Sequence, residues 1–175
     1  GQADIETMAR AAQSTGLEYL AITDHSQALA MANGLDETRA LRHAEAIRAV
    51  DRRLPNITLL AGIECDIHAD GRLDLSEDCL AELDIVIASV HSSFKQDDRE
   101  MTDRILRAIE SPVVDIVGHP TGRLLLRREP YNLNMDEIIE AVETIQNEGL
   151  KQFALLQCTG NYPTKLSDSN LQVMK

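Results

Sequence analysis

The chain has 175 residues, of which 43% are hydrophobic and 3% aromatic, and its 29 acidic and 17 basic side chains give a formal net charge of −12. This length suits one domain with a sizeable core, and the excess of acidic groups argues against broad nucleic-acid binding. The three cysteines form no CxxC pair, no apolar run reaches the roughly 20 residues of a membrane span, and no signal peptide opens the chain, so we expect a cytoplasmic protein without a membrane partner.

Helical and strand patterns alternate from one end of the chain to the other. The first amphipathic helix is capped by Asp4 and ends at Gly16. Further helices are predicted over residues 36–53, over residues 102–110, and from an Asn134 cap, with Glu137 at the capping-box position, to Gly149. Apolar strands are predicted over residues 17–23, 57–63, 85–90, 113–117 and 153–156.

Near-continuous apolar strands separated by helices indicate a parallel sheet covered by helices, so the fold class is α/β with a five-stranded parallel sheet in one domain, residues 1–175. A complete eight-stranded barrel takes about 250 residues. The sheet is therefore either a partial TIM-like barrel or an open doubly wound sheet. Because open sheets expose edge strands, a homodimer that completes the sheet is a further expectation.

Four potential metal ligands lie at the ends of four successive predicted strands. His25 follows the first strand, Glu64 ends the second, His91 ends the third and His119 follows the fourth. Carboxyl ends of parallel strands meet at one edge, where α/β proteins build their sites. One histidine at a strand end is more often a hydrogen-bonded structural residue, but four consecutive strands are harder to explain that way. Imidazole and carboxylate donors favour zinc, with manganese as the alternative.

The other two histidines fall outside this pattern. His43 lies inside a predicted helix and His68 in a polar loop, and both are predicted to be solvated. Cys65 and Cys158 lie near strand ends, where a thiolate could join the ligands, but buried core positions are the expectation for both.

Five short motifs over residues 1–141 resemble, in order, the PHP (polymerase and histidinol phosphatase) superfamily, and within it the PHP domain attached to bacterial family X DNA polymerases. They are residues 21–26 (AITDHS), 31–35 (MANGL), 62–64 (GIE), 89–93 (SVHSS) and 118–123 (GHPTGR). The resemblance implies a distorted seven-stranded (β/α) barrel with a trinuclear metal centre that hydrolyses phosphoesters. In the polymerase-linked members it implies trimming of DNA 3′ ends.

The resemblance also implies roles for individual residues. Glu64, His91 and His119 match the set that holds one metal, with Glu64 bridging to a second. His25 matches a ligand of the third metal, with Asp24 beside it. The family's His-x-His motif, the histidine that follows it and its late Asp-x-His motif have no counterpart in this sequence. Two of the three metals therefore lose most of their ligands.

The tail, residues 142–175, resembles N-acetylneuraminate (sialic acid) synthases. The resemblance rests on residues 143–145 (ETI), 155–164 (LLQCTGNYPT) and 168–171 (DSNL). It implies a substrate contact for Tyr162, but the segment is too small a part of that barrel for synthase activity. Two barrel families joined inside a helix, near residues 140–142, suggest an engineered chimera.

Two functional hypotheses follow. The first is an engineered barrel-fragment protein derived from a PHP phosphoesterase, without full activity but still binding a divalent metal. The alternative is an active metal-dependent phosphoesterase acting on a phosphoester or a DNA 3′ end, with His25 as the catalytic group that protonates the leaving oxygen. Arg123, next to Arg127 and Arg128, is the candidate phosphate-binding residue, unless these arginines only pair with surplus acids on a solvated loop.

Overall fold

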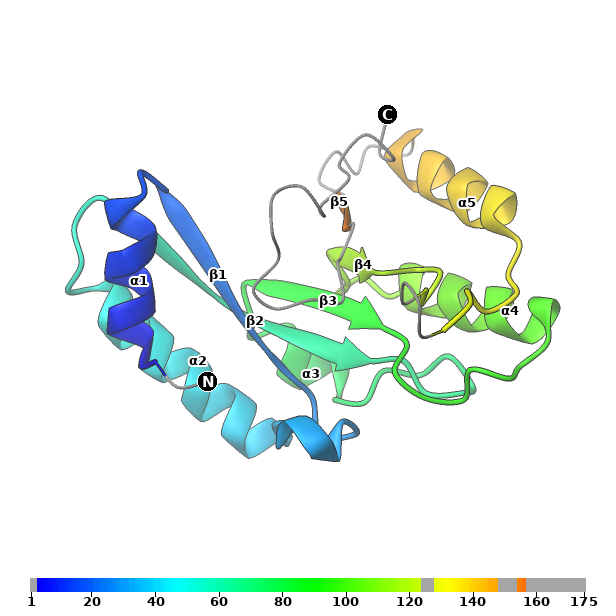
Figure 1. Cartoon of the computed structure of the whole chain (residues 1–175), viewed down its shortest axis with the longest axis horizontal. Helices are drawn as coiled ribbons and strands as arrows, with labels where there is room; N and C mark the ends of the chain where they lie inside the picture. The colour runs from blue at the N-terminus through cyan, green and yellow to red at the C-terminus, as the bar shows by residue number, and fades with distance from the viewer. Residues whose placement is uncertain (1–2, 124–127, 148–153, 157–175) are drawn as a thin grey trace. The chain divides into compact units, whose positions relative to one another are not determined.

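The computed structural model describes residues 3–123, 128–147 and 154–156, in which helices and strands alternate along the chain (Figure 1). The strands are β1 (Tyr19–His25), β2 (Thr58–Asp66), β3 (Ile85–Ser89), β4 (Ile116–Gly118) and β5 (Ala154–Leu156). The helices are α1 (Ile5–Ser14), the 3-10 helix η1 (Ala30–Ala32), α2 (Glu37–Asp51), α3 (Glu77–Leu80), α4 (Asp98–Ile109) and α5 (Met135–Asn147).

The strands form one sheet in the order β1-β2-β3-β4-β5. The β1/β2 pair is parallel, with Tyr19 opposite Thr58 and His25 opposite Glu64, and the β4/β5 pair is also parallel. The predicted α/β class with a parallel sheet is therefore confirmed. A strand order that follows the chain is that of a (β/α) barrel fragment, whereas doubly wound sheets reverse their order at a switch point. The open doubly wound alternative does not fit this order.

The chain divides into two compact units. The first comprises residues 1–65 and 74–87, and the second residues 66–73 and 88–175. In the first unit α1 packs against β1 and α2. The core of this unit is aliphatic, as the scarcity of aromatic residues predicts, and its buried members are Ala9, Ile22, Ala44, Ile47, Val50, Leu54, Ile57, Leu59 and Ala61.

The second unit is built around the packing of α4 against α5. Met101, Ile105 and Ala108 are fully buried on α4, at the three- and four-residue spacing of one helix face. On α5, Ile138 and Val142 are buried at the same spacing. The apolar face predicted for this last helix is therefore the face that packs.

Aspartates begin three of the helices. The side chain of Asp4 accepts a hydrogen bond from Thr7 N at 2.7 Å, so the predicted cap is confirmed. The side chain of Asp36, the predicted first residue of the second helix, accepts one from Arg39 N at 2.8 Å and caps that helix. Helix α4 begins at Asp98, earlier than the predicted start at residue 102, because Asp97 forms a capping box with Glu100 that the sequence analysis missed.

Removal of this cap is expected to destabilise the second unit. We expect Asp97→Ala to lower the free energy of unfolding by about 1 kcal/mol, since the amides of the first turn lose their acceptor. Asp97→Asn is the matched control and should stay within a few tenths of a kcal/mol of the parent, because asparagine caps about as well as aspartate. Urea unfolding of the three proteins measures the difference, and an alanine variant as stable as the parent would show that the cap contributes nothing.

Strand boundaries also differ from the predicted ones. β2 continues three residues beyond Ile63, through Asp66. β4 starts at Ile116 rather than at Val113, because the preceding residues form a turn in which Val114 N donates to Ser111 O at 3.2 Å. Within residues 3–123, 128–147 and 154–156, no helix has the length and apolarity needed to cross a membrane.

Candidate metal centre

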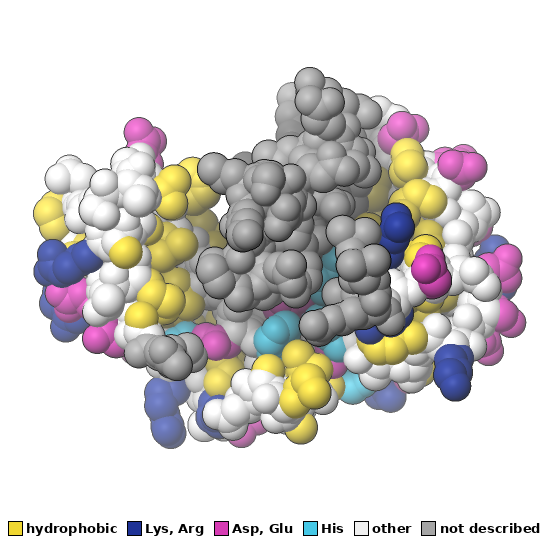
Figure 2. Space-filling model, viewed as in Figure 1, with side chains coloured by type: hydrophobic (Ala, Val, Ile, Leu, Met, Phe, Trp, Pro, Cys, Tyr) yellow, Lys and Arg dark blue, Asp and Glu magenta, His cyan; other side chains and the backbone are white. Residues whose placement is uncertain are grey.

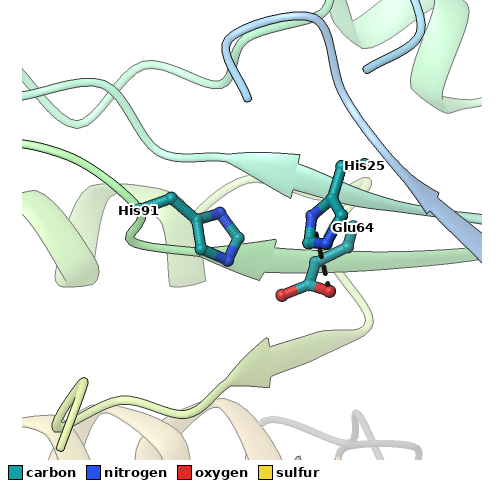
Figure 3. Close-up of side chains that lie close together, drawn as sticks. All are labelled: His25, Glu64 and His91. Atoms are coloured by element: carbon teal, nitrogen blue, oxygen red, sulfur yellow. Dashed lines mark ion pairs between the residues drawn. The ribbon is translucent and has the colours of Figure 1, made fainter. Parts of the chain in front are cut away.

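His25 and Glu64 meet at the carboxyl ends of β1 and β2 in the first unit. The two residues are opposite each other in the parallel register, and Ser26 N donates to Glu64 O at 3.1 Å, which fixes the two strand ends together. Nδ1 of His25 lies 3.7 Å from Oε2 of Glu64, as the dashed line in Figure 3 marks. Both side chains are partly exposed, so a ligand could reach them from solvent.

His91 and His119 lie together in the second unit. His91 comes two residues after β3 and His119 directly follows β4, and their ring centroids are 5.1 Å apart with the ring planes at 65°. His119 adopts a backbone φ of 31°, which residues other than glycine rarely adopt. Such strain is usually kept where a side chain must point in a set direction.

Asp66 belongs to this second pair, although the sequence analysis did not single it out. It is the last residue of β2, it is 3% exposed, and its Oδ1 is hydrogen-bonded to Nδ1 of His91. The sequence could have identified it, because Asp66 comes two residues after Glu64 and alternate residues of a strand point to the same face.

His43 is not simply solvated, as was predicted. Its Nε2 lies 2.8 Å from Oδ2 of Asp24, the residue that precedes His25 in β1. The prediction was wrong because the partner is brought in by the return of α2 towards β1, which no local pattern shows. The imidazole therefore lies beside Asp24, the neighbour of a candidate ligand.

Cys65 lies in the core, which was the expectation for it. The residue is fully buried, and burial raises the pKa of its thiol to about 11.

The basic loop after His119 is described only in part. Arg123 is exposed. Arg128 donates through Nε to Gly122 O at 2.8 Å and places its guanidinium 4.0 Å from the centre of the Phe94 ring. Arg127, Cys158 and Tyr162 lie outside the described residues. On the face drawn in Figure 2, basic side chains lie among acidic ones on both units.

The described donors fit a divalent metal. His25, Glu64 and His91 are candidate ligands by side-chain type and accessibility, and His119 offers a further imidazole beside His91. Imidazole and carboxylate groups at the ends of strands indicate the class, a (β/α) protein whose described residues include a possible metal-binding set.

The family follows from comparison with known proteins. The PHP domain family matches residues 1–155, so the chain belongs to this family of metal-dependent domains. Homologues include the DNA polymerase/3′-5′ exonuclease PolX of Bacillus subtilis, 46% identical over 140 residues, which are 80% of this chain and 25% of that protein.

Probable phosphatases form a second group of relatives. One from Caldanaerobacter subterraneus is 31% identical over 139 residues, and one from Acetivibrio thermocellus is 32% identical over 142 residues. These matches cover 77% and 79% of this chain and 50% and 54% of the relatives. The chain therefore spans between a quarter and about half of the length of these proteins.

The family match corrects the predicted boundary at residue 141. It continues to residue 155 and so includes the rest of α5 and most of β5, which we had assigned to a sialic acid synthase-like tail. The comparisons give no support to a synthase fragment or to an engineered joint within α5.

Proposed function

We propose that the chain carries a metal-dependent phosphoesterase site in which Glu64, His91 and His119 hold one divalent ion. The observation that supports this most is the pairing of these groups at strand ends: His25 with Glu64 in one unit and His91 with His119 in the other. When bound, zinc or manganese would supply a nucleophile from water near neutral pH and neutralise charge on the phosphoryl oxygens.

His25 is the proposed proton donor to the leaving oxygen. Its Nδ1 lies 3.7 Å from the Glu64 carboxylate, and its side chain is 32% exposed.

The proposed substrates are phosphoesters, with a DNA 3′ end as the first candidate, because the name of the Bacillus subtilis homologue includes a 3′-5′ exonuclease. Phosphomonoesters are the second candidate, from the probable phosphatases. Arg123 is the proposed phosphate-binding residue: it is exposed and follows the glycine whose carbonyl holds Arg128.

A second candidate function is metal binding without turnover. It requires only the imidazole and carboxylate donors, and neither a proton donor nor a phosphate-binding arginine. Neither candidate function assigns a role to residues 157–175.

Metal analysis together with two hydrolysis assays tests the proposal. We expect purified protein to bind one equivalent of zinc or manganese and to hydrolyse a 3′-labelled single-stranded DNA or a chromogenic phosphomonoester only when that metal is present. Chelation followed by metal addition controls for a contaminating hydrolase. Absence of any bound metal would refute both candidates, whereas a bound metal without hydrolysis of either substrate would favour the second.

A further inference from the structure

We infer that Asp66 is a positioning residue of the candidate metal centre, which holds the His91 ring so that its Nε2 faces the ion. The inference rests on the proposed function, because it gives His91 the role of a ligand. It goes beyond the family resemblance, which assigns no part to Asp66.

The hydrogen bond between Asp66 and His91 decides the tautomer of the imidazole. A carboxylate can only accept, so His91 must carry its proton on Nδ1, and in the neutral ring this leaves the Nε2 lone pair open. Metal-bound histidines commonly donate their second ring N–H to a carboxylate, which fixes the ring and makes the ligating nitrogen more basic. Asp66 meets this requirement from a position that water scarcely reaches, since its side chain is 5% exposed.

The backbone on both sides of the pair is held by Arg104 of α4, whose side chain is buried. Its Nε donates at 3.1 Å to the carbonyl of Ile67, the residue after Asp66. Its Nη1 donates at 3.0 Å to the carbonyl of Ser92, the residue after His91. The amide of Ile67 also donates to Ser89 O at 2.8 Å, which joins the ends of β2 and β3. The pair is therefore preorganised by the protein itself.

The carboxyl end of β2 therefore contributes two residues to the candidate metal centre. Glu64 and Asp66 are two residues apart and point to the same face, while Cys65 between them is buried in the core. One strand provides a proposed ligand and also the group that orients a ligand on the neighbouring strand.

Zinc affinity of Asp66 variants, measured by competition with a chromophoric chelator, tests the inference without any activity assay. We expect Asp66→Ala to weaken zinc binding about 10- to 100-fold. Asp66→Asn should weaken it less, since the amide oxygen can still accept from Nδ1 although the negative charge is lost. Asp70→Asn is the matched control, because Asp70 is an exposed aspartate of the same unit that pairs with Arg72, and it should leave the affinity unchanged.

The tautomer of His91 is the second readout. In ¹⁵N-edited NMR spectra of the metal-free protein, with His91→Gln used for assignment, we expect the proton on Nδ1 in the parent and in Asp66→Asn. A proton on Nε2 in the parent would overturn the inference, and so would unchanged zinc affinity in folded Asp66→Ala. Equal losses in the alanine and asparagine variants would also overturn it, because they would make Asp66 a direct ligand. If the parent binds no zinc, the proposed function fails, while the tautomer still decides whether Asp66 sets the ring.

Discussion

Replacement of Glu64 by alanine is expected to abolish tight zinc binding and to lower kcat/KM for phosphoester hydrolysis about a thousandfold. The carboxylate is the only anionic group in the proposed ligand set, and a catalytic metal lowers the activation free energy by several kcal/mol, which corresponds to a rate factor of this order. Inductively coupled plasma analysis of the dialysed protein and steady-state kinetics at saturating metal measure the two effects.

The fold should tolerate this change. Glu64 lies two residues before the end of β2 and its side chain is 20% exposed, so truncation leaves no closed cavity in the core. The matched control is Glu45→Ala on α2, where an exposed carboxylate paired with Arg52 is removed and both metal content and rate should stay as in the parent. Retention of one metal equivalent in Glu64→Ala would remove Glu64 from the ligand set.

Features that depend on a few neighbouring residues could be predicted from the sequence. Asp4 and Asp36 cap their helices because an aspartate before an amphipathic pattern has free amides within reach of its own side chain. The meeting of His25 and Glu64 could also be predicted, because parallel pairing brings the carboxyl ends of neighbouring strands to one edge.

Features that depend on residues far apart in the chain could not be predicted from the sequence. Asp66 contacts His91 across 25 residues, and Arg104 contacts Ile67 across 37. Arg104 lies three residues after Met101 and four before Ala108, on the buried face of α4, and it is 1% exposed, but this spacing does not show which groups it contacts. Only the order of the strands and the packing of α4 bring these groups together, and neither leaves a local trace in the sequence.

The helix that we had divided between two families illustrates another limit of local patterns. Ile138 and Val142 keep one buried face through residues 140–142, which fitted a designed joint as well as an uninterrupted helix. Because the PHP match continues through residue 155, an uninterrupted helix from one family explains this buried face, and no joint is needed. Smooth periodicity shows that a helix packs and carries no information on its origin.

Replacement of Arg104 by methionine is expected to lower the free energy of unfolding by about 1–3 kcal/mol. Methionine fills much of the same volume but leaves the carbonyls of Ile67 and Ser92 and the amide oxygen of Gln96 without their donor. The Ile67 carbonyl is buried, and an unpaired buried acceptor costs about 1–3 kcal/mol, whereas Ser92 is exposed and Gln96 is partly exposed, so water can replace the donor at these two oxygens. Urea unfolding measures the loss, and Arg107→Met, which removes an exposed arginine bonded to Asp70 O, should cost less than about 1 kcal/mol.

Arg104→Lys separates the role of Arg104 in stability from its role at the centre. Lysine keeps the charge but lacks the rigid fork that reaches Ile67 O and Ser92 O together, so we expect a smaller loss of stability than with methionine. Asp66 and His91 directly precede Ile67 and Ser92. Weaker hydrogen bonds to these two carbonyls should therefore weaken zinc binding, although no proposed ligand has been substituted. Zinc affinity unchanged in folded Arg104→Lys would mean that the Asp66–His91 hydrogen bond holds its geometry without the buried arginine.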